Sequence, residues 1–200
     1  MLVKMARAKP ATARPTWRVD RLRHGAVPLL LALDEDDRLV YVALAATPAG
    51  LAEHATRHHA VLRVETRART KARTELREYL AGRRREFTID VRPLGTDFEQ
   101  RVWAALAEIP YGTTSSYAQL AEKVGDRGGA RAVGRANGRN PIPLVLPCHR
   151  VIGAGGELVG FGGGLPTKRW LLQLEREHRP PPWSPRDDAA RSPQQLGLFG

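Results

Sequence analysis

The chain from Trp17 onward alternates short apolar runs with polar turn residues, and this rhythm predicts strands and helices of ordinary length. The expected strands are residues 27–33, 39–45 and 87–91, and the expected helices are residues 49–59 and 71–80. The first two strands flank an acidic turn at residues 34–37, which is the pattern of a β-hairpin. We therefore expect residues 17–92 to form a small α/β domain.

Helical periodicity and capping residues dominate from Gly95 onward. Thr96 and Glu99 have the spacing of a capping box, and Ser116 and Gln119 repeat it ahead of a shorter helix. A further helix fits residues 130–138, after a glycine-rich turn. Two short helices joined by such a turn predict a helix-turn-helix, a unit that many proteins use to bind DNA.

Prolines, glycines and one closing helix make up the rest of this region. We interpret residues 140–152 as an extended apolar segment, residues 153–164 as a glycine-rich loop and residues 167–178 as a helix. Residues 93–179 are thus expected to form a second domain. We expect residues 1–16 to be a mobile basic tail and residues 180–200 a flexible, proline-rich tail.

Charge and cysteine content narrow the class of protein. The chain carries 32 Lys and Arg against 21 Asp and Glu, a net charge of +11, which favours a polyanionic partner, although an arginine-rich proteome would explain it equally well. The single cysteine excludes an intramolecular disulfide framework. No apolar run reaches the ~20 residues of a membrane helix, and the start lacks a secretory signal pattern. We therefore expect a cytoplasmic protein without a membrane segment.

The one cysteine, Cys148, is followed directly by a histidine. A thiolate is the nucleophilic form of cysteine, and a neighbouring base or positive field is needed to lower its pKa. The dipeptide alone favours a buried structural cysteine beside a surface histidine. Adjacent side chains of an extended segment point to opposite faces, so we expect His149 to reach the sulfur through a bridging water.

The wider sequence changes that balance. The string PCHRVI is preceded by SYAQLA, ARAVGRANGRNP and NPIPLVL and followed by FGGG and KRWLLQLE, and this order resembles the O6-alkylguanine-DNA alkyltransferases, also called methylated-DNA–protein-cysteine methyltransferases. The resemblance runs from about Gly95 to Glu175, whereas the N-terminal region matches only in layout. It implies an α/β (α+β) protein with a small ribonuclease H-like α/β domain followed by a mainly helical, winged helix-turn-helix-like domain.

The resemblance also implies an activity, the repair of O6-alkylguanine, above all O6-methylguanine, with O4-methylthymine as a further substrate. The alkyl group would pass irreversibly to Cys148, without a cofactor and once per molecule. His149 would draw off the thiol proton and Glu175 would orient that histidine. Tyr117 would give a proton to the departing base, and Asn140 would position the cysteine region. Without the resemblance, Glu175 fits the charge pattern of a solvated helix, Tyr117 fits a helix core and Asn140 fits a turn.

Double-stranded DNA is the implied partner, because a base must leave the duplex to reach a buried thiol. Arg131 would enter the base stack, and Arg135 and Arg139 would contact phosphates from the minor groove, although exposed arginines of a helix are usually just solvated. The substrate pocket would be walled by Tyr117, Val159, Phe161, Gly162 and Gly163. We expect the bulk of Val159 to disfavour large substituents such as benzyl.

Two histidines and the C-terminal tail lead to separate expectations. His54 and His58 lie one helical turn apart, but no third or fourth ligand is evident, so we expect no zinc. The tail resembles peptides by which bacterial repair proteins dock on the sliding clamp, and its alternative is a terminus that packs on its own domain. The clamp-like residues are Gln195, Leu196, Leu198 and Phe199.

Two other classes of function remain open from the residues. A non-catalytic binder of alkylated DNA, or a DNA-binding regulator, would explain the helix-turn-helix and the charge, but alkyltransferase-like binders lack the cysteine. A Cys–His hydrolase would explain Cys148 but not the arginines. We expect a monomer in solution, in the bacterial cytosol and associated with the nucleoid.

Overall fold

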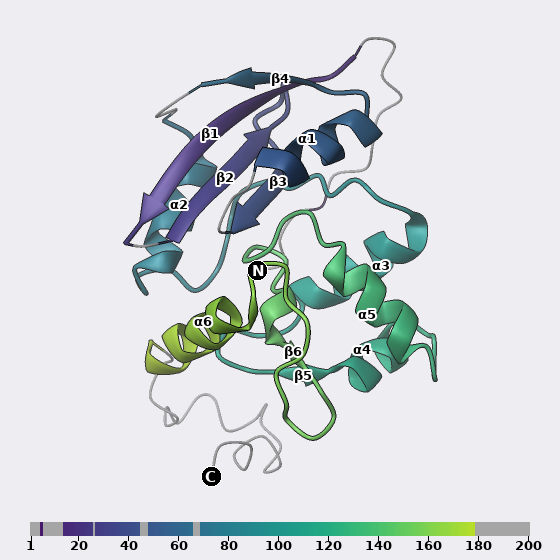
Figure 1. Cartoon of the computed structure of the whole chain (residues 1–200). Coiled ribbons are helices and arrows are strands. Elements are labelled where there is room, and N and C mark those ends of the chain that lie inside the picture. Colours follow the sequence, from purple (N-terminus) through teal and green to yellow (C-terminus); the bar gives the residue numbers. More distant parts are fainter. Residues whose placement is uncertain (1–4, 6–13, 26, 45–47, 66–68, 179–200) are drawn as a thin grey trace.

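The structure, a computed structural model, describes residues 5, 14–25, 27–44, 48–65 and 69–178 (Figure 1). A sheet with two helices forms the N-terminal half and a cluster of helices forms the C-terminal half, so the protein has a mixed α/β structure. Most of the predicted basic tail, the whole tail 180–200 and its clamp-like residues Gln195–Phe199 lie outside the described residues. None of the described helices is long and apolar enough to cross a bilayer.

Four strands form the N-terminal sheet in the order β3-β2-β1-β4. The strands are β1 (Thr16–His24), β2 (Val27–Leu33), β3 (Leu39–Leu44) and β4 (Val61–Val64). The first three are antiparallel neighbours, whereas β4 pairs parallel to β1. The predicted hairpin is confirmed as β2 and β3. Asp34 holds its acidic turn, because the Asp34 carboxylate accepts hydrogen bonds from the backbone N–H groups of Asp36 and Arg38.

Both faces of the sheet are covered, which explains why β2 is a continuous apolar run. Leu29, Leu31 and Leu33 pack on one face with α2 (Lys71–Leu80) and with the C-terminal half. Leu30 and Ala32 pack on the other face with α1 (Pro48–Arg57). The larger cluster continues from the sheet into the C-terminal helices, so the two halves share one core. The predicted helices 49–59 and 71–80 are confirmed, the first with slightly different ends.

Strand β1 and strand β4 do not follow from the apolar pattern. Arginines interrupt β1 at residues 18, 21 and 23, and every position of β4 is exposed. An edge strand that buries nothing lacks the alternation by which strands are recognised. These two strands can therefore be recognised only in the folded structure, from their backbone pairing with neighbouring strands.

The predicted strand at residues 87–91 is wrong in one respect. Phe87, Ile89 and Val91 are buried in alternation, as a strand would have them, but the segment forms only isolated bridges at Val91. Its C-terminal end forms two backbone hydrogen bonds with Leu39, whose N–H donates to Asp90 O at 2.9 Å and whose carbonyl accepts from Arg92 N–H at 2.9 Å. Alternation indicates which side of a segment is buried, but it does not show whether the backbone of that segment pairs with a strand.

Four helices build the C-terminal half. They are α3 (Asp97–Ala107), α4 (Tyr117–Lys123), α5 (Ala130–Gly138) and α6 (Leu165–Glu177). The capping boxes predicted at Thr96 and Ser116 are both formed. Helix α6 begins at Leu165 rather than Thr167, because Pro166 is tolerated in the first turn of a helix.

A small parallel sheet positions the segment that carries the cysteine. Strand β5 (Ser115–Ser116) precedes α4, and it pairs with β6 (Val151–Ile152), which follows the cysteine. On the other side, the backbone N–H of Val42 in β3 donates to the Pro141 carbonyl at 2.8 Å. The cysteine segment is thus anchored both to the start of α4 and to the N-terminal sheet.

Candidate active site

Cys148 begins a single turn of 3-10 helix, Cys148–Arg150. The residues before it, 141–146, form bends and a turn, and Leu144 has a φ of 76°. The prediction of an extended segment is therefore wrong, because prolines fix φ at a value that suits turns as well as strands. Successive side chains of a 3-10 helix are about 120° apart, so Cys148 and His149 do not point to opposite faces.

His149 is fully buried and bonded to a carboxylate. Its Nε2 lies 2.9 Å from Glu175 Oε1, and its Nδ1 is buried without a hydrogen-bond partner among the described residues. Because the carboxylate accepts, Nε2 carries the hydrogen and Nδ1 keeps its lone pair. Burial lowers the pKa of His149 and outweighs the opposing effect of Glu175. The ring is thus a neutral base whose free nitrogen is Nδ1.

Glu175, on α6, is the centre of this buried network. Besides His149, its oxygens accept hydrogen bonds from the Tyr79 hydroxyl at 2.6 Å and from the Gly112 N–H at 2.9 Å. The Arg150 guanidinium adds contacts of 2.8 to 3.1 Å. Burial alone would raise the pKa of Glu175, but the hydrogen bonds and charges of His149 and Arg150 bring it well below its usual range. The carboxyl is therefore ionised.

Tyr79 reaches this network from the N-terminal half. It lies on α2, it is fully buried, and its hydroxyl is also 3.3 Å from His149 Nε2. Burial raises the pKa of Tyr79 well above its ordinary value, so the hydroxyl keeps its proton and donates a hydrogen bond to Glu175. Tyr79 lies in the predicted helix 71–80, but the sequence does not connect it with the site. The one available signal was a polar tip on an apolar helix face.

Arg150 is a second residue of the site that the sequence interpretation does not assign. Its guanidinium neutralises the buried Glu175 and donates from Nη1 to the Ile109 carbonyl at 2.5 Å. It also lies 5.6 Å from the ring centroid of Tyr111. A buried carboxylate is tolerated when a cation and several donors satisfy it, and Arg150 supplies that cation.

The Cys148 thiol is buried and weakly acidic. Burial raises the pKa of the thiol to about 11, and the hydrogen bond of Asn140 and the charge of Lys168 offset this effect only in part. Lys168 is buried too, and its ammonium donates to the carbonyl oxygens of Val151 at 2.6 Å and Val159 at 2.8 Å. The thiol is protonated at neutral pH, so its use as a nucleophile requires a base during the reaction.

Asn140 and Tyr117 flank the cysteine from different elements. Asn140 Nδ2 donates to the Leu146 carbonyl at 2.7 Å, and its Oδ1 accepts from the Ile142 N–H at 2.9 Å, so this residue holds the turns that precede Cys148. Tyr117 is the first residue of α4 and is half-buried. Burial, with a smaller contribution from Cys148, raises the pKa of Tyr117, which keeps its hydroxyl protonated.

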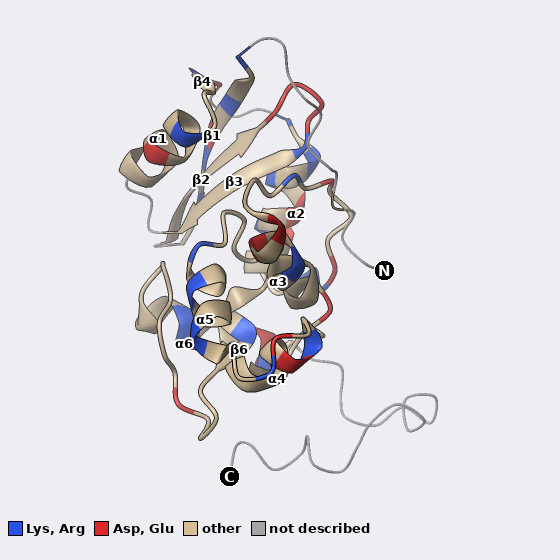
Figure 2. Cartoon of the chain, turned by 90° about the vertical axis from the view of Figure 1, so that its right-hand side faces the viewer, with Lys and Arg blue, Asp and Glu red and all other residues tan. Residues whose placement is uncertain are grey.

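Helix α5 turns its arginines to solvent. Its inner face is buried through Val133, Ala136 and Asn137. Arg131 and Arg135 are exposed and have no ion-pair partner among the described residues, and basic positions mark this helix in Figure 2. Arg139, just beyond the helix, pairs with Glu99 at 3.2 Å. Two of the three predicted DNA contacts are therefore uncommitted, and the third already has an acidic partner.

Apart from Tyr117, the predicted pocket residues lie on the loop between β6 and α6. The exposed fraction of Val159 is 37%, and the Phe161 ring is half-buried at 6.5 Å from the His149 ring, centroid to centroid. Gly162 is exposed. A Cβ on Gly163 would lie 2.9 Å from the Phe161 ring and 3.2 Å from Leu44, so a larger residue would push against both.

His54 of α1 and His58, just beyond this helix, belong to an aromatic cluster. His54 stacks near Trp17 and Tyr41, with ring centroids 5.4 and 5.1 Å away, and lies 4.7 Å from His58. Burial lowers the pKa of His54 to about 4, with smaller effects of His58 and Arg57. Within the described ranges, no group of three or more His, Cys, Asp or Glu side chains is arranged to hold a metal.

The sequence is similar to those of methylated-DNA–protein-cysteine methyltransferases. Residues 97–177 match the family model described as 6-O-methylguanine DNA methyltransferase, DNA binding domain. The methylated-DNA–protein-cysteine methyltransferase of Mycobacterium tuberculosis H37Rv is 55% identical over 106 residues, which are 53% of this chain and 64% of that protein. The protein of the same name from Mycolicibacterium paratuberculosis is 55% identical over 114 residues, which are 57% of this chain and 69% of the relative.

The three-dimensional similarity is broader than the sequence match. A crystal structure of Mycobacterium tuberculosis OGT in complex with DNA has a TM-score of 0.70 and 40% identity, and the match covers 82% of this chain and 95% of that one. In sequence, by contrast, the chain spans 64% of the length of the Mycobacterium tuberculosis relative. The fold similarity thus includes most of the N-terminal half, where the sequences diverge.

Proposed function

Because the chain belongs to the methylated-DNA–protein-cysteine methyltransferase family, we propose that it repairs O6-alkylguanine in DNA by accepting the alkyl group on Cys148. The observation that carries this proposal is the state of His149, the neighbour of the cysteine. Its Nε2 is fixed by Glu175, and its buried Nδ1 is uncommitted among the described residues. A buried thiol with a raised pKa needs such a base, and a structural cysteine does not.

The reaction is a single displacement. His149 Nδ1 takes the thiol proton through a water molecule while Cys148 Sγ attacks the alkyl carbon. The new S–C bond forms as the bond between that carbon and guanine O6 breaks. The electron pair of the broken C–O bond passes to the guanine base. The Tyr117 hydroxyl protonates the departing guanine and regains a proton from solvent. The product is a thioether, which does not leave, so each molecule acts once.

The charges of the site support this proton transfer. As His149 becomes an imidazolium, the ionised Glu175 stabilises the positive charge at a distance of 2.9 Å. Arg150 and Tyr79 hold the carboxylate in place, so its orientation is fixed before reaction. Asn140 positions the turns before Cys148, which aligns the sulfur with its substrate.

Duplex DNA binds along α5 in this proposal, with α4 and α5 as the helix-turn-helix. Arg131, exposed at the start of α5, enters the base stack in place of the flipped nucleotide, and Arg135 contacts phosphates. Arg139 contributes less, because its ion pair with Glu99 has to be shared. O6-methylguanine and O4-methylthymine are the substrates, and Val159, Phe161, Gly162 and Gly163 line the pocket.

The finer architecture belongs to the same proposal. The mixed sheet with α1 and α2 supports a ribonuclease H-like N-terminal domain over residues 17–92, and the pair β5 and β6 beside α4 and α5 supports a winged helix-turn-helix over residues 93–179. The protein acts as a monomer in the cytosol, near the nucleoid, where its substrate is.

The C-terminal tail is proposed to dock on the sliding clamp. Capture by immobilised clamp is expected to disappear when residues 195–199 are deleted, and unchanged capture would refute docking.

Counting repaired lesions tests the proposed function. A duplex with O6-methylguanine is incubated in excess over the protein, and the remaining lesion is quantified by mass spectrometry of digested DNA. Repair is expected to stop when one lesion per protein molecule is lost, and Cys148→Ala is expected to repair none. Binding without loss of lesion would indicate a damage binder, and continued turnover would contradict the suicide mechanism.

A further inference from the structure

A basic hollow of about 570 Å³ lies along the exposed side of α2, outside the site described above. We call it the α2 hollow. The residues that line it are Arg69, Thr70, Lys71, Arg73, Thr74, Arg77, Glu78 and Arg83. The opposite, buried side of the same helix carries Tyr79. The hollow and the active site therefore use different faces of one helix.

Much of the positive charge of the α2 hollow has no acidic partner among the described residues. Arg73 pairs with Asp20 at 2.5 Å, and Glu78 pairs with Arg84 at 2.7 Å, so these two pairs are locally neutral. The side chains of three other lining residues have no ion-pair or hydrogen-bond partner among the described residues; they are Arg69, Arg77 and Arg83. Three exposed guanidinium groups thus share one concave surface with Lys71, whose ammonium donates to the Thr88 carbonyl.

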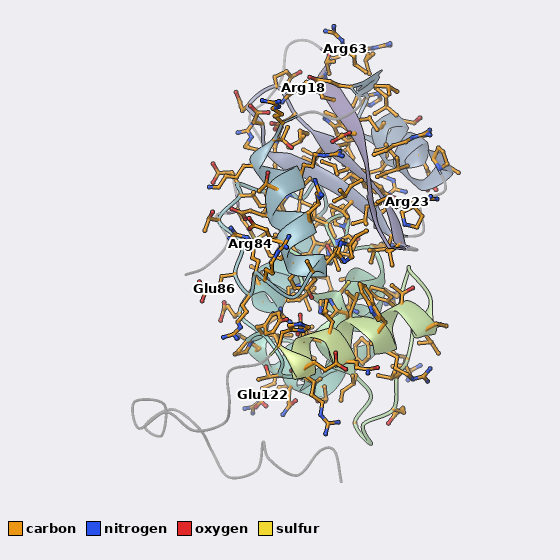
Figure 3. The ribbon with its side chains drawn as sticks, turned by 90° about the vertical axis from the view of Figure 1, so that its left-hand side faces the viewer. Arg18, Arg23, Arg63, Arg84, Glu86 and Glu122 are labelled. Carbon is orange, nitrogen blue, oxygen red and sulfur yellow. The ribbon has the colours of Figure 1, made fainter. Side chains whose placement is uncertain are left out.

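The α2 hollow and helix α5 face opposite directions. Helix α2 lies on the side turned to the viewer in Figure 3, where Arg84 is labelled, and α5 lies on the side turned to the viewer in Figure 2. These two views look at the molecule from opposite sides, and Figure 1 places α2 and α5 at its left and right. A straight duplex held by α5 would not reach the hollow.

We propose that the α2 hollow binds the phosphate backbone of a second duplex of DNA, so that one protein molecule bridges two DNA segments. Guanidinium groups bind phosphate oxygens through paired N–H donors, and a duplex presents one negative charge per about 1.7 Å of its axis. The proposal rests on the proposed function in one respect, because a protein already held on DNA by α5 meets neighbouring segments at high local concentration.

Bridging is measured by energy transfer between two undamaged 20-base-pair duplexes, one carrying a donor dye and the other an acceptor. The full chain is compared with Arg77→Ala/Arg83→Ala and with the charge-matched control Arg23→Ala/Arg63→Ala, whose exposed arginines lie on the sheet away from the hollow (Figure 3). We expect the wild type and the control to bring the duplexes together. The hollow variant should lose bridging at least tenfold.

Salt dependence and repair separate the possible results. The logarithm of the binding constant for the second duplex falls linearly with the logarithm of the salt concentration. For the hollow variant this slope should be smaller in magnitude by about 2, since each lost phosphate contact removes about 0.9. Its methyl transfer from a single short duplex should equal that of wild type. Absence of bridging by wild type, or equal bridging by the hollow variant, would overturn the proposal. Bridging without any methyl transfer would instead refute the proposed function and leave the α2 hollow supported.

Discussion

The hydroxyl of Tyr79 donates a 2.6 Å hydrogen bond to Oε1 of Glu175, and this bond crosses from the sheet half of the protein to its helical half. The same carboxylate oxygen holds Nε2 of His149 at 2.9 Å. The N-terminal half is therefore more than a neighbour of the site, because it supplies a donor that fixes the orientation of the proposed base.

Replacing Tyr79 by phenylalanine removes this donor and keeps the ring. A hydrogen bond to a charged group contributes about 1.5–3 kcal/mol, so single-turnover methyl transfer should slow by about tenfold or more. With one donor fewer, Glu175 interacts more strongly with His149 and raises the histidine pKa, so the midpoint of the pH–rate profile should move to higher pH. A structural role alone would lower stability without moving that midpoint.

Tyr111→Phe is the matched control for this variant. The Tyr111 hydroxyl is buried without a hydrogen-bond partner among the described residues, although its ring lies 6.1 Å from that of Tyr79. Removal of this hydroxyl should leave both rate and midpoint unchanged. If the two phenylalanine variants behave alike, the positioning role of Tyr79 is wrong.

Glu175→Gln should be destabilising as well as slow. The change leaves the buried Arg150 without its counter-charge, and breaking a buried ion pair typically costs about 3–5 kcal/mol. Urea unfolding measures this cost. Glu177→Gln, at an exposed position of the same helix, should unfold like wild type. A Glu175→Gln protein as stable as this control would show that the buried network contributes little to the fold.

Much of the fold can be predicted from the sequence where local signals are strong. The capping boxes at Thr96 and Ser116, and the hairpin around Asp34, follow from side chains that bond to their own backbone. Strand β4 does not, because none of its positions is buried. Local pattern records what an element buries, and an exposed edge strand depends on its backbone partner.

The site divides in a similar way. Family resemblance points to Cys148, His149 and Glu175, and the structure brings the last two together. The 3-10 turn at Cys148 is hidden by its prolines, which suit several backbone conformations. Tyr79 is distant in the sequence from its partner, so no local pattern could relate the two residues. Long-range polar contacts of this kind need the folded chain.

His54 should make the protein sensitive to acid. Its pKa is about 4 in the folded state and about 6.5 when unfolded, so the neutral, buried form stabilises the fold at neutral pH and this stability is lost as the pH falls below 6.5. The loss at pH 4.5 should be on the order of 2 kcal/mol. Urea unfolding of His54→Phe should show a smaller drop between pH 7 and 4.5 than wild type. His59→Asn, at an exposed position, is the control. A drop in the stability of His54→Phe equal to that of wild type would contradict this assignment.

Val159→Gly should widen the range of accepted alkyl groups. Val159 is partly exposed on the loop over the site, and its carbonyl is held by Lys168, so the backbone should stay in place when the side chain is removed. The rate with O6-benzylguanine should rise relative to that with O6-methylguanine. The measurement is the ratio of the two rates in wild type and in the variant. An unchanged ratio would contradict the steric explanation.

The most direct test of alkyl transfer to Cys148 is the mass of the Cys148 peptide after incubation of the protein with a duplex that carries O6-methylguanine. We expect a gain of one methylene on this peptide, at one per molecule, while undamaged duplex produces no gain and Cys148→Ser acquires none. An unmodified Cys148 peptide after complete loss of the lesion, or a methyl group found on another residue, would contradict this transfer.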